Sequence, residues 1–265
     1  MENLDFGVIL AAGSGSRLYP LTKFFPKITL PIFDKPLIVH HFEILHSIGI
    51  KKVYIVVSGN NHGMITEVLK KTNHADIDYD FINQDYLGGT GHALWLLKNQ
   101  LENSRFILLL GDEYYNDITS FKKIRECEDE NILGIVEYDD VETIMSGCNV
   151  IINNNYITRL KEKPKENEIE GKWCWDGSVV LNPIIFEVLD EMIKSNHKEK
   201  GELCIVKAMQ IMLDRNIPIS TIKKTCANIN ITSDIDLLKA NFIECTKKYD
   251  STHILDILKK TIKTH

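Results

Sequence analysis

The first half of the chain alternates short apolar runs with amphipathic stretches, and this alternation limits the possible folds more than any other feature. The apolar runs predict buried strands at residues 6–11, 53–57, 79–82, 105–110 and 132–137. Helical patterns separate them at residues 37–47, 64–71, 93–98 and 118–128. Because repeated strand–helix–strand units form sheets covered by helices, we expect a parallel, doubly wound α/β sheet.

This alternation changes after about residue 140. Asn153-Asn154-Asn155 separates two short apolar runs and predicts a hairpin turn. Further strands are predicted at residues 173–181 and 219–222, and helices at 183–192, 203–213, 235–245 and 254–262. Without a repeat or a long linker, we expect one continuous domain over residues 1–247 and a C-terminal helix within 248–265.

A glycine-rich turn, Ala11-Ala12-Gly13-Ser14-Gly15-Ser16-Arg17-Leu18, follows the first predicted strand. In an α/β sheet this turn lies at the carboxyl edge, where backbone N–H groups can approach phosphate oxygens. Leu18 stands where a dinucleotide fingerprint needs its third glycine, and no Gly-Lys-Ser/Thr tripeptide of a P-loop occurs. Arg17 and Lys27 could neutralise the same phosphates. The alternatives are a simple tight turn and two solvated surface cations.

Charge and composition exclude several classes of partner. The net charge of −6 argues against nucleic acid and anionic membranes, and no run approaches the length of a transmembrane helix. Residues 1–5 lack the basic start and apolar stretch of a signal peptide. The six cysteines contain no C-x-x-C pair, which disfavours a zinc site and suits reduced thiols. We therefore expect a cytoplasmic protein.

The glycine turn belongs to a longer composite motif. The segment from Leu10 to Thr22, followed by Phe25-Pro26-Lys27, Leu30-Pro31-Ile32 and Asp34-Lys35-Pro36, resembles the signature of sugar-1-phosphate nucleotidylyltransferases. The resemblance spans roughly Phe6 to Ala240. It implies a Rossmann-like, mostly parallel sheet of the nucleotide-diphospho-sugar transferase type, with a small substrate-side β lobe. It also implies that a nucleoside triphosphate and a sugar 1-phosphate are joined with Mg²⁺ and pyrophosphate is released, by a protein that in relatives is often a homo-oligomer.

In this resemblance, residues 1–140 form the nucleotide-binding half. The nucleotide-binding residues are expected to be Ala11, Ala12, Gly13, Ser14, Gly15, Ser16, Gln84, Gly89 and Thr90. Gln84 and Gly89 match a base-reading segment for a pyrimidine, which favours UTP or dTTP. An amide at a strand end can pair with a carbonyl and a ring N–H, although a lone glutamine is more often a surface residue. We expect His92 to seat the start of a helix.

Two residues match the metal position of the family. Asp112 follows a buried strand and Gly111, so its carboxylate is expected to face the ligand crevice, where it is a suitable Mg²⁺ ligand. Otherwise Asp112 would cap a helix. Asn230 stands where many relatives carry a second aspartate, and its amide oxygen can also bind Mg²⁺. Asp234 and Asp236 are expected to start a helix instead.

Residues 141–247 are expected to bind the sugar phosphate through Gly147, Glu162 and Gly177, with Lys163 on the acceptor phosphate. Without the resemblance, the charged stretch around Lys163 would be a solvated loop. Arg17, Lys27 and Lys163 are the predicted catalytic cations. Two other functions stay open: a cytidylyltransferase acting on a non-sugar phosphate, and a non-catalytic binding or regulatory subunit.

Overall fold

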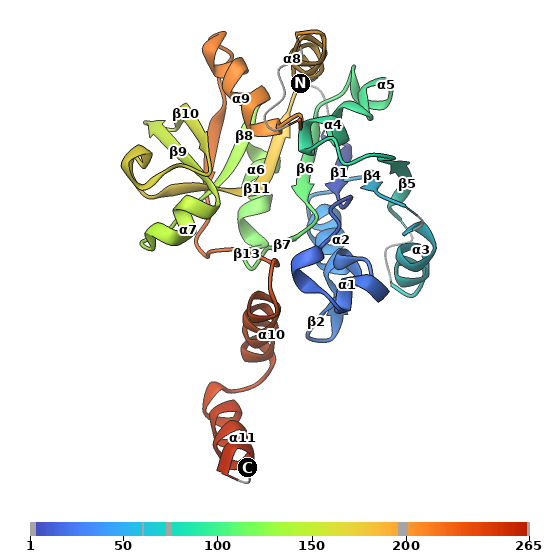
Figure 1. Cartoon of the computed structure of the whole chain (residues 1–265), viewed down its shortest axis with the longest axis vertical. Helices are drawn as coiled ribbons and strands as arrows, with labels where there is room; N and C mark the ends of the chain where they lie inside the picture. Colours follow the sequence, from blue (N-terminus) through green and yellow to red (C-terminus); the bar gives the residue numbers. More distant parts are fainter. Residues whose placement is uncertain (1–3, 60, 73–75, 196–200, 264–265) are drawn as a thin grey trace.

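The computed structural model describes residues 4–263 except 60, 73–75 and 196–200. Residues 1–3 and 264–265, which the arguments about a signal peptide and the last helix include, lie outside this part. Within the described residues the main sheet has the strand order β5-β4-β1-β6-β11-β8-β12-β10-β9 (Figure 1). Its strands are β1 (Phe6–Leu10), β4 (Lys52–Val57), β5 (Asp78–Asn83), β6 (Phe106–Leu110), β8 (Ile132–Glu137), β9 (Cys148–Asn153), β10 (Tyr156–Glu162), β11 (Trp173–Leu181) and β12 (Ser220–Lys223).

The predicted parallel arrangement holds in the first half of the sheet. Strands β5, β4, β1 and β6 are mutually parallel, and Leu10 at the end of β1 is level with Val56 and Leu110. The three strand ends therefore meet at one edge, and the loops that follow them start side by side. This shared edge brings the glycine-rich turn next to Gly111 and Asp112.

The second half corrects the expectation of a parallel sheet. Strand β11 lies between β6 and β8 and runs antiparallel to both, so the sheet is mixed. The β9–β10 hairpin is confirmed, with a two-residue turn in which Asn154 adopts a φ of 57°. The sequence pattern predicted where these strands lie in the chain. Local alternation does not indicate which distant strand pairs with β6.

Helices cover both faces of the sheet. One face carries α2 (Leu37–Ser47), α3 (His62–Lys70) and α6 (Thr119–Glu126), and the other carries α4 (Thr90–Trp95), α8 (Ile184–Lys194) and α9 (Ile205–Asp214). The pattern at 93–98 forms two short helices, α4 and α5 (Lys98–Leu101), instead of one. Two further short helices, α1 (Leu21–Phe24) and α7 (Val141–Ser146), lie in segments without a helical pattern.

Small two-stranded pairings connect the sheet to the C-terminal helices. Strands β7 (Glu113–Tyr114) and β13 (Ile229–Asn230) pair antiparallel, as do β2 (Pro31–Ile32) and β3 (Lys35–Pro36). Helix α10 (Asp234–Lys248) starts four residues after the end of β13, and α11 (Ser251–Lys263) follows it. Figure 1 shows both helices extending away from the sheet. No described helix combines the length and apolarity needed to cross a membrane.

Candidate functional site

A cavity of about 830 Å³ opens at the carboxyl ends of β1 and β6 and reaches across to the β9–β10 hairpin. Every candidate site residue from the sequence lines this one cavity. They are Ala11, Ala12, Gly13, Ser14, Gly15, Ser16, Arg17, Lys27, Gln84, Gly89, Thr90, Asp112, Gly147, Glu162, Lys163, Gly177 and Asn230. The two halves of the chain therefore contribute to a common site.

The glycine-rich turn forms one wall of the cavity. Gly15 adopts a left-handed conformation, with φ 62°, and the Thr22 hydroxyl donates a hydrogen bond of 2.7 Å to its carbonyl oxygen. A Cβ atom on Gly15 would lie 2.9 Å from Thr22 Cγ2, so a larger residue would displace the turn. Arg17 is exposed and forms no ion pair with any other residue that the structure describes. Its guanidinium can therefore serve an anionic ligand.

Asp112 and Lys27 form an ion pair at the floor of the cavity. Lys27 Nζ lies 3.0 Å from Asp112 Oδ2, and their side chains are 12% and 36% exposed. The hypothesis that Asp112 caps a helix is wrong, because β7 follows it directly. Gly111 is required just before it, since a Cβ atom there would lie 2.6 Å from the Leu10 carbonyl oxygen. This close approach holds the ends of β1 and β6 together.

Gln84 is a buried residue, so the alternative of a surface amide is wrong. Its side chain is 3% exposed, and Nε2 donates to the Gly89 carbonyl oxygen at 3.1 Å. Nε2 also lies 3.0 Å from His92 Nδ1, which places His92 at the start of α4, as expected. With its nitrogen held by the protein, Gln84 offers its amide oxygen to the cavity. Gly89 has φ 90°, and a Cβ atom on it would lie 2.5 Å from the Leu203 carbonyl oxygen.

The hairpin side of the cavity presents a cation on a fixed backbone. Lys163 N–H donates to the Gly147 carbonyl oxygen at 2.8 Å, and Lys163 adopts a φ of 45°. Its side chain is exposed and forms no ion pair within the described part of the chain. Trp175 lines the cavity and donates from Nε1 to the Ser178 carbonyl oxygen at 2.8 Å. The Lys163 side chain is therefore exposed, as expected of a solvated loop, but its backbone is fixed by the bond to Gly147.

Sequence reasoning missed the role of Glu113. Its carboxylate is 6% exposed and accepts a hydrogen bond of 2.7 Å from Asn230 Nδ2 and another from Asn228 Nδ2. Burial, and next the charge of Asp112, raise the pKa of Glu113 well above its ordinary value, whereas the two amide donors lower it. The adjacent pair Asp112-Glu113 at a strand end was the available signal, but only the β7–β13 pairing reveals the partners.

A second group that the sequence did not reveal lies beneath Glu113. Lys224 Nζ is 3.5 Å from Asp176 Oδ2, with side-chain exposures of 3% and 1%. Burial lowers the pKa of Lys224, while the charge of Asp176 raises it. The ammonium also lies 3.1 Å from the centre of the Phe121 ring. This buried pair connects the loop before β13 to β11.

The prediction that Asp236 starts a helix is confirmed. Asp236 Oδ2 accepts from the backbone N–H of Ser233, and the Ser233 hydroxyl accepts from the Asp236 N–H, which is a capping box for α10. Asp236 is thereby occupied, and Asp234 lies at the exposed first position of the same helix. Of the candidate metal residues, Asp112 and Asn230 both line the cavity and keep their oxygens available for a cation.

The oxygen donors of Asp112 and Asn230 fit the chemistry of Mg²⁺. This ion is usually held by one or two carboxylates, with substrate phosphates and waters completing its coordination. The described residues contain no cluster of three or more His, Cys, Asp or Glu side chains that could hold a metal by themselves. A carboxylate and an amide oxygen beside a phosphate-binding turn suit an ion that arrives with a nucleotide.

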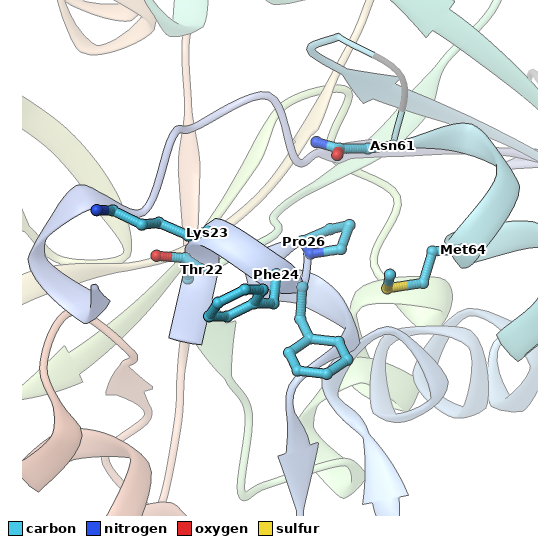
Figure 2. Close-up of a pocket in the computed structure, with 7 residues that line it drawn as sticks. Thr22, Lys23, Phe24, Pro26, Asn61 and Met64 are labelled. Carbon is cyan, nitrogen blue, oxygen red and sulfur yellow. The ribbon is translucent and has the colours of Figure 1, made fainter. Parts of the chain in front are cut away.

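A second, smaller hollow lies outside the main cavity. Figure 2 shows it between the α1 segment and α3, with Thr22, Phe24, Pro26 and Met64 on its walls. Its volume is about 100 Å³, which is too small for a nucleotide. Sequence reasoning did not single it out, and no candidate residue lines it.

The chain matches the family model described as nucleotidyl transferase over residues 6–225. The bifunctional protein GlmU of Methanococcus vannielii is 32% identical over 212 residues, which cover 78% of this chain and 47% of the relative. The bifunctional sugar-1-phosphate nucleotidylyltransferase/acetyltransferase of Sulfurisphaera tokodaii is 30% identical, covering 77% and 47%. The chain therefore spans about half the length of these two relatives.

A solved structure shows the same fold. The crystal structure of a UDP-glucose pyrophosphorylase complexed with UDP-glucose superposes with a TM-score of 0.78 at 23% identity, and covers 93% of this chain and 100% of the other. At this identity the likeness concerns the fold, including the mixed α/β sheet.

Proposed function

Because this chain belongs to the nucleotidyl transferase family, we propose that it transfers a nucleotidyl group from a nucleoside triphosphate to a sugar 1-phosphate. The products would be an NDP-sugar and pyrophosphate. The observation that carries this proposal is the common cavity, in which the glycine-rich turn, the Lys27–Asp112 pair and Lys163 face one volume. A relative named for this chemistry supports it, since the match to the sugar-1-phosphate nucleotidylyltransferase/acetyltransferase covers 77% of the chain.

In the proposed complex the triphosphate occupies the glycine-rich side. Backbone N–H groups of residues 13–16 and the guanidinium of Arg17 would bind the β- and γ-phosphates. Lys27, whose ammonium is mostly buried, would neutralise the α-phosphate. Residues 1–140 would thus hold the nucleotide. Such an arrangement lets a protein of net charge −6 bind a polyanion through locally placed cations.

For the base, the state of Gln84 favours UTP or dTTP. Its nitrogen is engaged by Gly89 and lies against His92, so its oxygen is the atom available to a ligand. An acceptor pairs with the ring N3–H of uracil or thymine, whereas N3 of cytosine is itself an acceptor. This complementarity argues for a pyrimidine with an N3–H group and against CTP.

The sugar 1-phosphate would lie across the cavity against residues 141–247. Lys163 would bind its phosphate, while Glu162 accepts hydrogen bonds from sugar hydroxyls and the backbones of Gly147 and Gly177 approach the ring. The backbone contact between Lys163 and Gly147 supports this assignment, because it ties the cation to the glycine. Trp175 would form a wall of the sugar pocket.

The chemistry then requires orientation and charge neutralisation. A phosphate oxygen of the sugar attacks the α-phosphorus in line, the new P–O bond forms, and the α–β bridging oxygen leaves with pyrophosphate. Lys27 and Arg17 stabilise the charge that develops on the α-phosphate and the leaving group. Asp112 and Asn230 would hold Mg²⁺, which supplies charge neutralisation between the two reactants. No protein nucleophile is required, because the attacking monoester is already anionic.

The test is pyrophosphate release with Mg²⁺ over a grid of UTP, dTTP, CTP, ATP and GTP against several sugar 1-phosphates. We expect release with UTP or dTTP and one sugar phosphate, and nearly complete loss in Asp112→Asn with the fold intact. Asp76→Asn, at an exposed carboxylate paired with His46, is the matched control. Nucleotide binding without release across the grid would refute the proposal. Release on then adding a non-sugar phosphate with CTP would establish the cytidylyltransferase alternative, and no release there either would favour the non-catalytic one.

A further inference from the structure

The carboxylate of Glu113 is bound by two asparagine side chains, one on each oxygen. Oε1 accepts from Asn230 Nδ2 at 2.7 Å, and Oε2 accepts from Asn228 Nδ2. Both residues line the main cavity, but Glu113 is buried whereas Asn230 is exposed. The buried carboxylate contacts Asn230 through the amide nitrogen.

The backbone fixes this arrangement. In the β7–β13 ladder Glu113 is paired directly with Asn230, and Ile231 N–H donates to the Asp112 carbonyl oxygen at 2.8 Å. Gly177, at φ 86°, makes room for the carboxylate, because a Cβ atom on it would lie 2.7 Å from Glu113 Cγ. The β7–β13 pairing and the absence of a side chain at Gly177 therefore position the Glu113 carboxylate beside Asn230.

The two asparagines differ in how firmly their amides are held. Asn228 donates from Nδ2 to the Asp176 carbonyl oxygen at 2.9 Å as well as to Glu113, and its Oδ1 lies 3.3 Å from the Tyr138 hydroxyl. Asn230 is held through its nitrogen by Glu113 alone among the described residues. The two amide donors favour the ionised form of Glu113. If the Asn230 amide turned over beside this ionised carboxylate, its oxygen would face a carboxylate oxygen, which is an unfavourable contact between two acceptors. Glu113 therefore decides which atom of Asn230 faces the cavity.

We infer that Glu113 is a positioning residue that holds the Asn230 amide with its oxygen toward the cation site beside Asp112. The inference rests on the proposed function, because it gives that oxygen the metal to bind. Groups that orient a metal ligand through its second polar atom typically change metal affinity by about 10- to 100-fold. Without Glu113 the Asn230 side chain could equally present an NH₂ group, which repels a cation.

The substitution Glu113→Gln tests this directly. The glutamine NH₂ must face one asparagine NH₂, and the better-held Asn228 keeps its orientation, so the Asn230 amide turns over. In Glu113→Gln/Asn230→Asp the glutamine can donate to the new carboxylate and still accept from Asn228, which restores a complete set of hydrogen bonds. Asn230→Asp alone places two acceptors face to face.

A double-mutant cycle of thermal unfolding on metal-free protein measures the contact between Glu113 and Asn230. We expect Asn230→Asp to lower Tm by about 3 °C, the scale of one lost hydrogen bond in a chain of this size, and the double variant to regain most of that loss. Glu113→Gln alone should change Tm little, because the turned-over Asn230 amide accepts a hydrogen bond from the glutamine NH₂. The side-chain amide signals of Asn230 in a ¹⁵N spectrum should move in Glu113→Gln, while those of Asn228 move little. Additive losses of Tm, or an Asn230 amide that does not respond, would overturn the inference.

Binding of Mn²⁺ alone, measured by loss of its free electron-spin signal, tests the consequence. Affinity should fall about tenfold or more in Glu113→Gln and return in the double variant, whose carboxylate offers oxygen on both sides. Glu102→Gln, at an exposed residue outside the cavity, is the control. If the double variant binds as weakly as Glu113→Gln, Glu113 is itself a ligand and the inference is wrong. If the unaltered protein neither binds Mn²⁺ nor releases pyrophosphate, the proposed function fails, while the metal-free cycle still tests the contact.

Discussion

Lowering the pH should destabilise this protein through His41, a fully buried imidazole on α2. His41 Nδ1 lies 3.0 Å from the Leu37 carbonyl oxygen, and Nε2 lies 3.2 Å from that of Leu110, at the end of β6. Burial lowers the pKa of His41 from 6.5 to about 4, although both backbone contacts act to raise it. The neutral imidazole thus connects α2 to the strand that leads into Asp112.

The sign of the effect follows from proton uptake. In the unfolded chain this histidine is protonated below about pH 6.5. In the folded chain it stays neutral until the pH falls to about 4. The free energy of unfolding is therefore not reduced by His41 above its unfolded pKa. It falls as the pH drops from about 6.5 to about 4. A depression of this size corresponds to about 3 kcal/mol in full, of which about 2 kcal/mol is lost between about pH 7.5 and about pH 5.

The assay is urea unfolding at both pH values for the unaltered protein, His41→Gln and the exposed control His46→Gln. The glutamine amide can donate to the Leu110 carbonyl oxygen but does not titrate. We expect the loss of unfolding free energy between the two pH values to shrink by about 2 kcal/mol in His41→Gln and to stay nearly unchanged in the control. Adjacent His40, whose pKa burial also lowers, adds to the loss in all three proteins. An equal loss in His41→Gln and the unaltered protein would refute the reasoning.

Three further substitutions have defined outcomes. Gly89→Ala should cost about 1–3 kcal/mol in urea unfolding and weaken UTP binding, because φ is 90° and the new Cβ would meet a backbone oxygen at 2.5 Å. Unchanged stability would contradict that geometry. Lys27→Met should lower kcat by about 100-fold or more. Its partner Asp112 is 36% exposed, so unfolding should change by less than about 1 kcal/mol, and a loss of fold would mean that the ion pair is structural. Lys224→Met should cost about 3–5 kcal/mol by leaving Asp176 buried without its cation, and Lys224→Met/Asp176→Asn should recover part of that loss. A neutral single substitution would show that the pair is not coupled.

Local pattern predicted local structure well. Helix α2 runs from Leu37 to Ser47 in the structure, as expected from Pro36 before it and the apolar spacing within it. The β9–β10 hairpin and the capping box at Ser233 also depend on neighbouring residues only. The order of the strands does not, because the antiparallel insertion of β11 between β6 and β8 depends on contacts between residues about 70 positions apart. The mixed sheet was therefore beyond what alternation could reveal.

The same division holds at the site. Asp112 and the glycine-rich turn were predictable because each directly follows a recognisable buried strand, and strand ends share an edge. Glu113 was not, since its partners Asn228, just before β13, and Asn230, on β13, lie 115 and 117 residues away along the chain. Lys224 looked like an ordinary charged residue, and only the three-dimensional packing buries it against Asp176. What sequence reasoning missed are the long-range polar contacts behind the cavity wall.

The placement of β11 also determines when a growing chain can fold. Strands β5, β4, β1 and β6 are all synthesised by residue 110, yet the outer edge of β6 has no partner until β11 is complete at Leu181. Strand β8 is synthesised between β6 and β11, and it pairs with β11 on one side and β12 on the other, both of which are synthesised later. A nascent chain therefore carries two apolar strands with open edges for about 40 to 70 residues of translation, a state that favours intermolecular pairing. Fragments that end before Trp173 should aggregate, and the complete chain should gain most from a chaperone during this interval.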